Sequence, residues 1–299
     1  MDTRKPKKPF IKYLKIAAAL AIIFFSAKLA VQHFVRPGPE ELARRSSHTV
    51  SPKKKPARPA PRAAAPPAAA KSEAPAGPGS PRMAIILDDW GNNYAVIDYA
   101  LAVGRPLTLS ILPNLPNSAK IAEKAHSEGL GVMLHMPMQP ISKKQPLEPH
   151  TILTTTPDAD IRRFLSDALA SVPYVEGVNN HQGSAATSDA RVMNVVLGEI
   201  KKRGLFFIDS AVIATIKSPA IAAKLGLRYD KRDVFIDNVL KGDAIKAELR
   251  RAIRLAVKKG DVIVIGHDHK QTLIAIKDML PEIDAAGVRL VTADEMVRS

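Results

Sequence analysis

The sequence of 299 residues contains no cysteine, so the fold has no disulfide bonds and a metal site has no thiolate ligands. Any metal must therefore be held by His, Asp or Glu, and stability must come from a hydrophobic core of ordinary size. The sequence also lacks an internal repeat. Its length fits one large domain or two ordinary ones.

Acidic residues are scarce in the first part of the chain. Residues 1–82 hold 17 Lys and Arg but only 4 Asp and Glu, a net charge of +13, whereas residues 83–299 hold 27 and 25, a net charge of +2. A domain that binds nucleic acid should carry its own basic field, which residues 83–299 do not. The charge distribution therefore argues against nucleic acid as a partner.

The N-terminal residues have the pattern of a membrane anchor. A basic flank at residues 1–15 precedes an apolar segment at 16–35, which predicts a cytoplasmic amino end and an exported remainder. Cleavage after Ala27 or Ala30 would place Phe25 or Lys28 where a small residue is required, so an uncleaved signal anchor is favoured over a removed signal peptide. The expected location is the bacterial inner membrane, single-pass, with the rest of the protein in the periplasm.

Residues 36–82 contain eleven prolines and no aromatic residue. This Pro/Ala/Lys-rich stretch cannot bury enough apolar surface to offset the entropy lost on ordering, so it is predicted to be a disordered tether. The folded domain is therefore expected at 83–299.

Strand and helix patterns alternate after Arg82. Thr156-Pro157, Ser188-Asp189, Ser218-Pro219 and Asp243 mark predicted helix starts. About seven β/α units in this length favour an α/β fold with a closed or nearly closed barrel, with an open doubly wound sheet as the alternative.

Five apolar runs end in an acid or a histidine. The residues at these ends are Asp88-Asp89, His135, His181, Asp209 and His267. The carboxyl ends of parallel strands lie side by side and are where β/α folds place their chemistry. Convergent Asp and His side chains at that edge are typical of a divalent-metal hydrolase.

Each of these residues has a possible role. Within the adjacent pair, Asp88 and Asp89, one carboxylate can bind a metal while the other acts as general base. Together with His135 and His181 they suit zinc or a similar ion. Asp209 can orient a histidine and His267 can protonate a leaving group.

The segments around these residues resemble the divergent polysaccharide deacetylase family, a branch of the carbohydrate-esterase deacetylases. They are Ile85–Gly91 (ILDDWG), Leu134–Met138 (LHMPM), Asn179–Ser184 (NNHQGS), Phe206–Ser210 (FFIDS), Asp233–Asn238 (DVFIDN) and Ile265–His267 (IGH). They occur in this order and cover essentially residues 83–299.

The resemblance implies a distorted (β/α)7 barrel and metal-dependent removal of acetyl groups from an N-acetylated cell-envelope glycan. By position it makes Asp88 the base, Asp89 and His135 metal ligands and His267 the acid. The second histidine ligand of the wider family would fall on Gln139. His181 is the best replacement, which completes an Asp89, His135 and His181 set for a divalent metal, zinc being favoured.

The chain departs from the wider pattern in its arginines. Ala185-Ala186 and Ala211-Val212 stand where arginines are expected after Gly183-Ser184 and Asp209-Ser210. These losses leave open an alternative, an inactive deacetylase-like domain that binds envelope glycan or a periplasmic partner. A haloacid-dehalogenase-type phosphatase is disfavoured because it needs Asp-x-Asp spacing.

Overall fold

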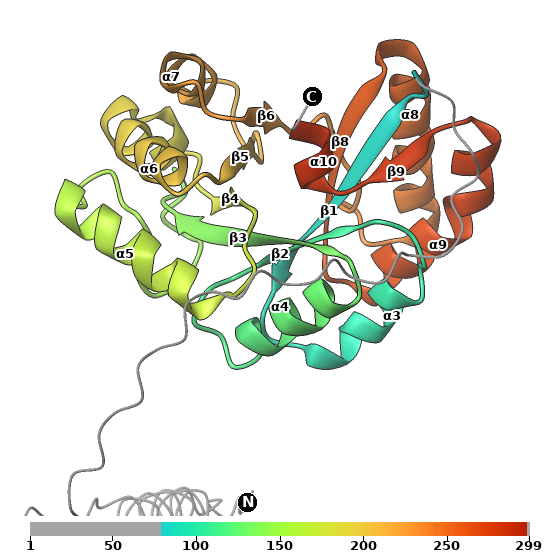
Figure 1. The fold of residues 1–299 in the computed structure, drawn as a ribbon, viewed down its shortest axis with the longest axis horizontal. Coiled ribbons are helices and arrows are strands. Elements are labelled where there is room, and N and C mark those ends of the chain that lie inside the picture. The colour runs from blue at the N-terminus through green and yellow to red at the C-terminus, as the bar shows by residue number, and fades with distance from the viewer. Residues whose placement is uncertain (1–78, 298–299) are drawn as a thin grey trace, which may run out of the picture. The chain divides into compact units, whose positions relative to one another are not determined.

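The computed structural model describes residues 79–297, which form the domain drawn in colour in Figure 1. The predicted flank (1–15), the anchor (16–35) and the tether up to residue 78 lie outside the described residues. Within 79–297, no helix has both the length and the apolar character needed to cross a membrane. The first strand, β1, starts at Arg82, whose guanidinium pairs with Asp261.

Strands and helices alternate along the domain, as the sequence predicts. The strands are β1 (Arg82–Trp90), β2 (Thr108–Ile111), β3 (Gly131–Met138), β4 (Gly177–Gln182), β5 (Phe206–Asp209), β6 (Tyr229–Lys231), β7 (Val234–Phe235), β8 (Asp261–His267) and β9 (Arg289–Val291). The main helices are α3 (Ile97–Leu101), α4 (Ser118–Ser127), α5 (Asp158–Ser171), α6 (Ala190–Lys202), α7 (Ser218–Leu225), α8 (Gly242–Lys259), α9 (Lys270–Ala285) and α10 (Ala293–Val297). Short 3-10 turns at Tyr94–Val96 and Ala186–Ser188 precede α3 and α6.

All strand pairs are parallel, in the order β6-β5-β4-β3-β2-β1-β8-β7, with β9 added beside β1. The two ends of this curled sheet, β6 and β7, are separated only by Arg232 and Asp233. The backbone N–H of Arg232 donates to Asp209 O on β5 at 2.9 Å, and the backbone N–H of Asp233 donates to Ile263 O on β8 at 2.9 Å. These two consecutive residues therefore connect the two ends of the sheet. The sheet thus curls into the arrangement of a distorted β/α barrel rather than an open doubly wound sheet.

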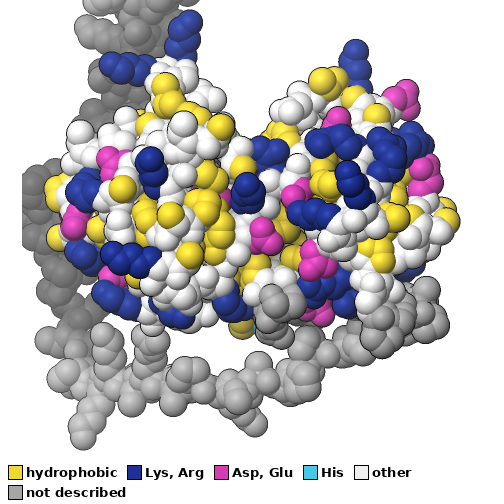
Figure 2. Space-filling view, turned by 90° about the horizontal axis from the view of Figure 1, so that it is seen from above, with side chains coloured by type: hydrophobic (Ala, Val, Ile, Leu, Met, Phe, Trp, Pro, Cys, Tyr) yellow, Lys and Arg dark blue, Asp and Glu magenta, His cyan; other side chains and the backbone are white. Residues whose placement is uncertain are grey.

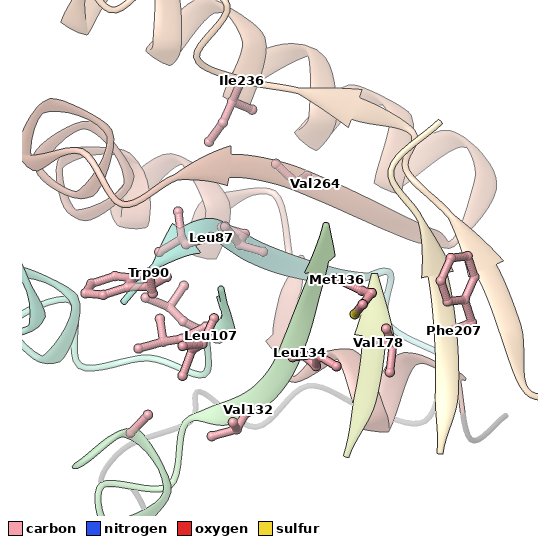
Figure 3. Close-up of a cluster of buried hydrophobic side chains, with 14 of the residues drawn as sticks. Leu87, Trp90, Leu107, Val132, Leu134, Met136, Val178, Phe207, Ile236 and Val264 are labelled. Carbon is pink, nitrogen blue, oxygen red and sulfur yellow. The ribbon is translucent and has the colours of Figure 1, made fainter. Parts of the chain in front are cut away.

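Successive side chains of β1 point alternately to the two faces of the sheet and contribute to two separate hydrophobic clusters. Met83, Ile85 and Leu87 belong to the large cluster between sheet and helices, part of which Figure 3 shows. Ala84 and Ile86 belong to a smaller cluster on the opposite face of the sheet, inside the curl, together with residues of α10. Both faces of β1 are buried, as expected for a central parallel strand. The inner cluster closes the amino end of the barrel, so polar side chains are left for its carboxyl end.

Three helix starts differ from those predicted. Asp243 does not cap α8, because it is the second residue of the helix and Lys241 occupies the cap position. Thr156 does not cap α5, because its Oγ1 accepts the backbone N–H of Leu153 and closes the preceding turn. Ser218 is the first residue of α7 rather than its cap. The Asp189 prediction is confirmed, since its side chain accepts the N–H of Val192 at the start of α6.

Charged side chains of both signs are scattered among apolar ones on the face of the domain shown in Figure 2. This mixture is what the near balance of Lys and Arg against Asp and Glu in residues 83–299 leads one to expect. A strongly basic face of the kind that binds a nucleic-acid backbone would need one sign to dominate.

Two glycines provide a matched test of the packing. An added Cβ at Gly177 would lie 2.2 Å from the ring of Phe206, its partner across β4 and β5, whereas Gly198 inside α6 has nothing within 4 Å. Gly177→Ala should lower the free energy of unfolding by about 2 kcal/mol or more through overpacking. Gly198→Ala should raise it by ~0.5–1 kcal/mol, because glycine weakens a helix interior. Chemical unfolding of the full chain measures both, and an unchanged stability in Gly177→Ala would contradict the packing.

Candidate active site

An extra residue at the carboxyl end of β1 brings two adjacent carboxylates close to the same histidine, His135. Between its pairings with Leu109 and Ile111 of β2, β1 has one residue more than its partner. Asp89 adopts a left-handed backbone conformation with φ 68°. Neighbouring strand residues normally point to opposite faces, and a bulge of this kind redirects one of them. Left-handed backbone at a non-glycine residue costs on the order of 1–3 kcal/mol, so the surrounding structure must hold Asp89 in this conformation.

The bulge directs Asp89 toward two histidines. Its Oδ1 lies 3.2 Å from His135 Nε2, at the carboxyl half of β3, and 3.0 Å from His181 Nδ1, at the end of β4. The two imidazole nitrogens lie 3.2 Å apart. One atom from each residue thus forms a nearly equilateral triangle, and the residues are those that the sequence predicts as metal ligands.

This triangle fits a tetrahedral metal site. Ligand atoms about 2.0–2.1 Å from a zinc ion are separated by about 3.3 Å, close to the three distances found here. Asp89 Oδ1 is buried and accepts no hydrogen bond of proper geometry from the described residues. Burial raises the pKa of Asp89, but His135 and His181 outweigh it and hold that pKa well below its usual range. The carboxylate is therefore ionised and one of its oxygens lacks a partner that a cation would supply.

Asn179 fixes the orientation of both the first ligand and the neighbouring acid. Its fully buried side chain accepts from His135 Nδ1 at 2.6 Å and from Ser110 Oγ at 2.6 Å, and it donates to Asp88 Oδ1 at 2.8 Å. Because the amide oxygen only accepts, His135 Nδ1 carries the hydrogen and its Nε2 lone pair faces the cleft. One side chain thus sets the tautomer of His135 and the position of Asp88.

Asp88 itself is buried and lies beside the metal-ligand triangle. Its Oδ2 is 3.7 Å from His135 Nε2, and its side chain is only about one-twentieth exposed. Burial raises the pKa of Asp88, while His135 and Asn179 oppose the rise. A carboxylate of raised basicity, with one oxygen held and the other facing the cleft, is suited to accept a proton.

His267 lies on the next strand, opposite Asp88 in the register of β1 and β8. Its Nδ1 is 3.0 Å from Asp237 Oδ1, and the backbone N–H of His267 donates to Asp237 Oδ2 at 2.7 Å. Burial lowers the pKa of His267, but the contact with Asp237 and the charge of Asp89 outweigh it and raise that pKa to about 9. His267 Nε2 points into the cleft, 3.8 Å from Asp89 Oδ2. The imidazole is thus a cation at neutral pH.

Asp209, which the sequence predicts to orient a histidine, makes no hydrogen bond or ion pair with one in residues 79–297. Asp209 is fully buried at the end of β5, where its Oδ1 accepts the backbone N–H of Ala211. Instead, Asn179 contacts Nδ1 of His135 and Asp237 contacts Nδ1 of His267. The barrel closes through β7, so Asp237 rather than Asp209 lies next to β8. Asp237 lies in one of the family-like segments, Asp233–Asn238. Its contact with His267 could be inferred only once the order of the strands in the sheet was known.

Gln139, at the position of the missing histidine ligand, has a structural role. Its side-chain oxygen accepts from Thr154 N at 2.6 Å and from Thr154 Oγ1 at 3.0 Å. Its backbone oxygen accepts from Ala185 and Ala186, in the turn that follows His181. Gln139 therefore holds segments on both sides of the site, and the second imidazole comes from β4.

Asp268 is a further carboxyl group at the site, to which the sequence assigned no role. Its backbone N–H donates to Asp88 O at 3.1 Å. Burial and the charge of Asp89 raise the pKa of Asp268 to about 6. The signal in the sequence that could have indicated a role is its place between two histidines, His267 and His269.

The family model for divergent polysaccharide deacetylases matches residues 85–297. The chain belongs to the divergent polysaccharide deacetylase family. The resemblance expected from the sequence motifs is thereby confirmed, and the family motifs are the ones that form the cleft.

Two relatives and one solved structure are similar to this chain. YibQ, an uncharacterized protein of Escherichia coli K12, is 34% identical over 216 residues, 72% of this deacetylase-family chain and 67% of the relative. An uncharacterized protein of Haemophilus influenzae Rd is 30% identical over 196 residues, 66% of this chain and 70% of its own. The crystal structure of uncharacterized protein ATU2773 from Agrobacterium tumefaciens C58 has a TM-score of 0.70 at 23% identity and covers 73% of this chain and 90% of its own. That structural likeness shows the fold.

Removing the Asn179 side chain tests its orienting role. Asn179→Ala should weaken Zn²⁺ binding by about 10–100-fold, because His135 is no longer held in the tautomer that presents Nε2 to the cleft. Competition with a chromophoric chelator measures the affinity. Asn194→Ala is the matched control, since Asn194 lies exposed on α6 and donates only to Ala190 O. Equal Zn²⁺ affinity in the two variants would rule out the orienting role.

Proposed function

We propose that this protein is a metal-dependent hydrolase that removes acetyl groups from N-acetylated cell-envelope polysaccharide. The proposal rests on one observation: a candidate base, a three-residue metal-ligand set and a paired histidine converge at one end of the barrel. Membership of the divergent polysaccharide deacetylase family supports it. The proposed location is the periplasmic side of the inner membrane, with residues 16–35 as the anchor.

In this proposal Asp89, His135 and His181 hold a divalent cation, for which zinc is the best candidate given one carboxylate and two imidazoles. Such an ion supplies Lewis-acid polarisation of the acetyl carbonyl and lowers the pKa of water. The three residues leave room for water and substrate, as catalytic metal sites require.

Two protons are moved by residues of the chain. Asp88 Oδ2 accepts a proton from the attacking water, while its Oδ1 stays hydrogen-bonded to Asn179. His267 Nε2 donates a proton to the amine nitrogen as the carbon–nitrogen bond breaks, while Asp237 holds its Nδ1. Acetate and the free amino sugar are the products. The catalytic assignments are thus Asp88 and His267, with Asp237 in the positioning role first given to Asp209.

Two variants separate chemistry from metal binding. Asp88→Asn should keep its metal and fold but lose deacetylation by at least about 100-fold, because the proton acceptor is gone. His181→Ala should lose the metal together with the activity. Acetate release from N-acetylated oligosaccharide and the metal content of the purified full chain are the measurements, and exposed Asp167→Asn on α5 is the control. Deacetylation by Asp88→Asn at the rate of the unaltered protein would exclude the mechanism.

The pH dependence tests the His267–Asp237 pair. His267 must be protonated to act, and its pKa of about 9 predicts that activity falls as pH rises through that value. The charge of Asp237 stabilises the imidazolium, so Asp237→Asn should lower this pKa and move the alkaline limb of the profile down by about one pH unit or more. The same limb measured in Asp167→Asn should not move. An unshifted limb in Asp237→Asn would mean that His267 is not the acid.

An inactive glycan-binding domain is the second candidate. It is favoured by Gln139, which stands where the wider family has a ligand and whose side chain is committed to Thr154. Purified protein that binds no metal and releases no acetate but still binds N-acetylated oligosaccharide would establish this reading.

A further inference from the structure

Arg232 lies where the barrel closes, between β6 and β7, and its side chain is firmly held. Its Nε donates to Ser210 O at 2.7 Å and its Nη2 donates to Ala211 O at 2.9 Å. Its guanidinium also lies over the ring of Phe235, 5.0 Å from the ring centre. Both hydrogen bonds and the stacking fix the plane of the guanidinium.

The charge of Arg232 is not neutralised by any carboxylate within salt-bridge distance in residues 79–297. Its acceptors are neutral backbone oxygens, and Nη1 has no hydrogen-bond partner among the described residues. Burial lowers the pKa of Arg232, a sign that the charged form is held at a cost. Buried charges are normally paired, so a partly buried guanidinium with a free edge calls for an anionic partner.

Arg232 lines two cavities. One, of about 400 Å³, is also lined by Phe235, Asn238 and Arg251, and its single acid, Glu248, is paired with Arg251 at 2.7 Å. The other, of about 590 Å³, is lined by Lys231 and by apolar residues, and it has no acid in its lining. The uncompensated charge of both cavities is therefore positive.

The first of these cavities adjoins the candidate active site through Phe235. The ring of Phe235 meets the ring of His267 edge-on, with centres 5.2 Å apart. The negative charge of Asp88 also acts on Arg232 and raises its pKa against the effect of burial. If one sugar of a glycan is positioned to receive a proton from His267, the adjacent sugar of the glycan would thus lie near Arg232.

We propose that Arg232 binds a carboxylate carried by the sugar next to the one that is deacetylated. The inference rests on the proposed function, because it places the acetylated sugar beside His267. A planar carboxylate matches the edge formed by Nη1 and Nη2.

The test uses three N-acetylated oligosaccharides of equal length: neutral, carboxylated on alternate sugars, and the same carboxylates converted to methyl amides. The zinc-loaded full chain should bind the carboxylated form about tenfold tighter than the amide, as one charge-assisted pair predicts. Calorimetry gives the dissociation constants, and the preference should shrink as ionic strength rises. Equal affinity for acid and amide would overturn the proposal without any variant.

Variants locate the effect. Arg232→Gln should reduce the acid-to-amide preference to about one, and Arg232→Lys should retain part of it. Arg163→Gln is the matched control, because Arg163 also stacks on a phenylalanine, Phe164, at 4.9 Å but on exposed α5. A preference retained in Arg232→Gln, with folding verified by thermal unfolding, would refute the assignment. Acetate release is scored separately, so failure of the deacetylase function shows as no acetate from any oligosaccharide.

Discussion

One extra residue in β1 is the constraint on which the site depends. Without it Asp88 and Asp89 would point to opposite faces of the sheet, and base and metal ligand could not share a cleft. With it, Asp89 takes a strained backbone conformation, and its Oδ1 faces two imidazoles without a proper hydrogen bond. Strain of this kind persists only where the surroundings determine it, here strands buried on both faces. A cation bound to Asp89 would offset part of that cost, so metal binding and stability should be linked.

The segment that closes the barrel supplies the other half of the site. Residues 229–235 pair first with β5 and then with β8, so one short stretch of chain leads to both Arg232 and Asp237. Asp237 receives His267 from the neighbouring strand, and Arg232 holds the turn after β5. The segment that closes the barrel therefore connects Asp237, the partner of His267, with Arg232, which lines the two cavities. Barrel closure and the proposed partner of His267 thus depend on the same short segment.

The sequence was sufficient to predict which residues lie at the strand ends. It was much less informative about which of their side chains contact one another. Asp88, Asp89, His135, His181 and His267 converge as their places after apolar runs indicate, because the ends of parallel strands share one edge. Partner choice depends instead on strand order and side-chain direction. The sequence therefore assigned the orienting of a histidine to Asp209, whereas Asp237 is the carboxylate that contacts His267. Asn179 was recognised only as part of a motif, since nothing in a strand pattern shows that one amide joins two neighbouring side chains.

The missing histidine at Gln139 is weaker evidence for lost function than it looks in the sequence. Gln139 has not simply lost a ligand, because its backbone oxygen holds the turn that follows His181 and its side chain holds the segment after β3. Gln139, at the position where the wider family has a histidine ligand, thus supports the backbone next to His181, the proposed replacement ligand. Three donor atoms still lie at tetrahedral spacing, which a decayed site would have no reason to keep. The relocation of one imidazole from β3 to β4 therefore favours a site that is rebuilt over one that is abandoned.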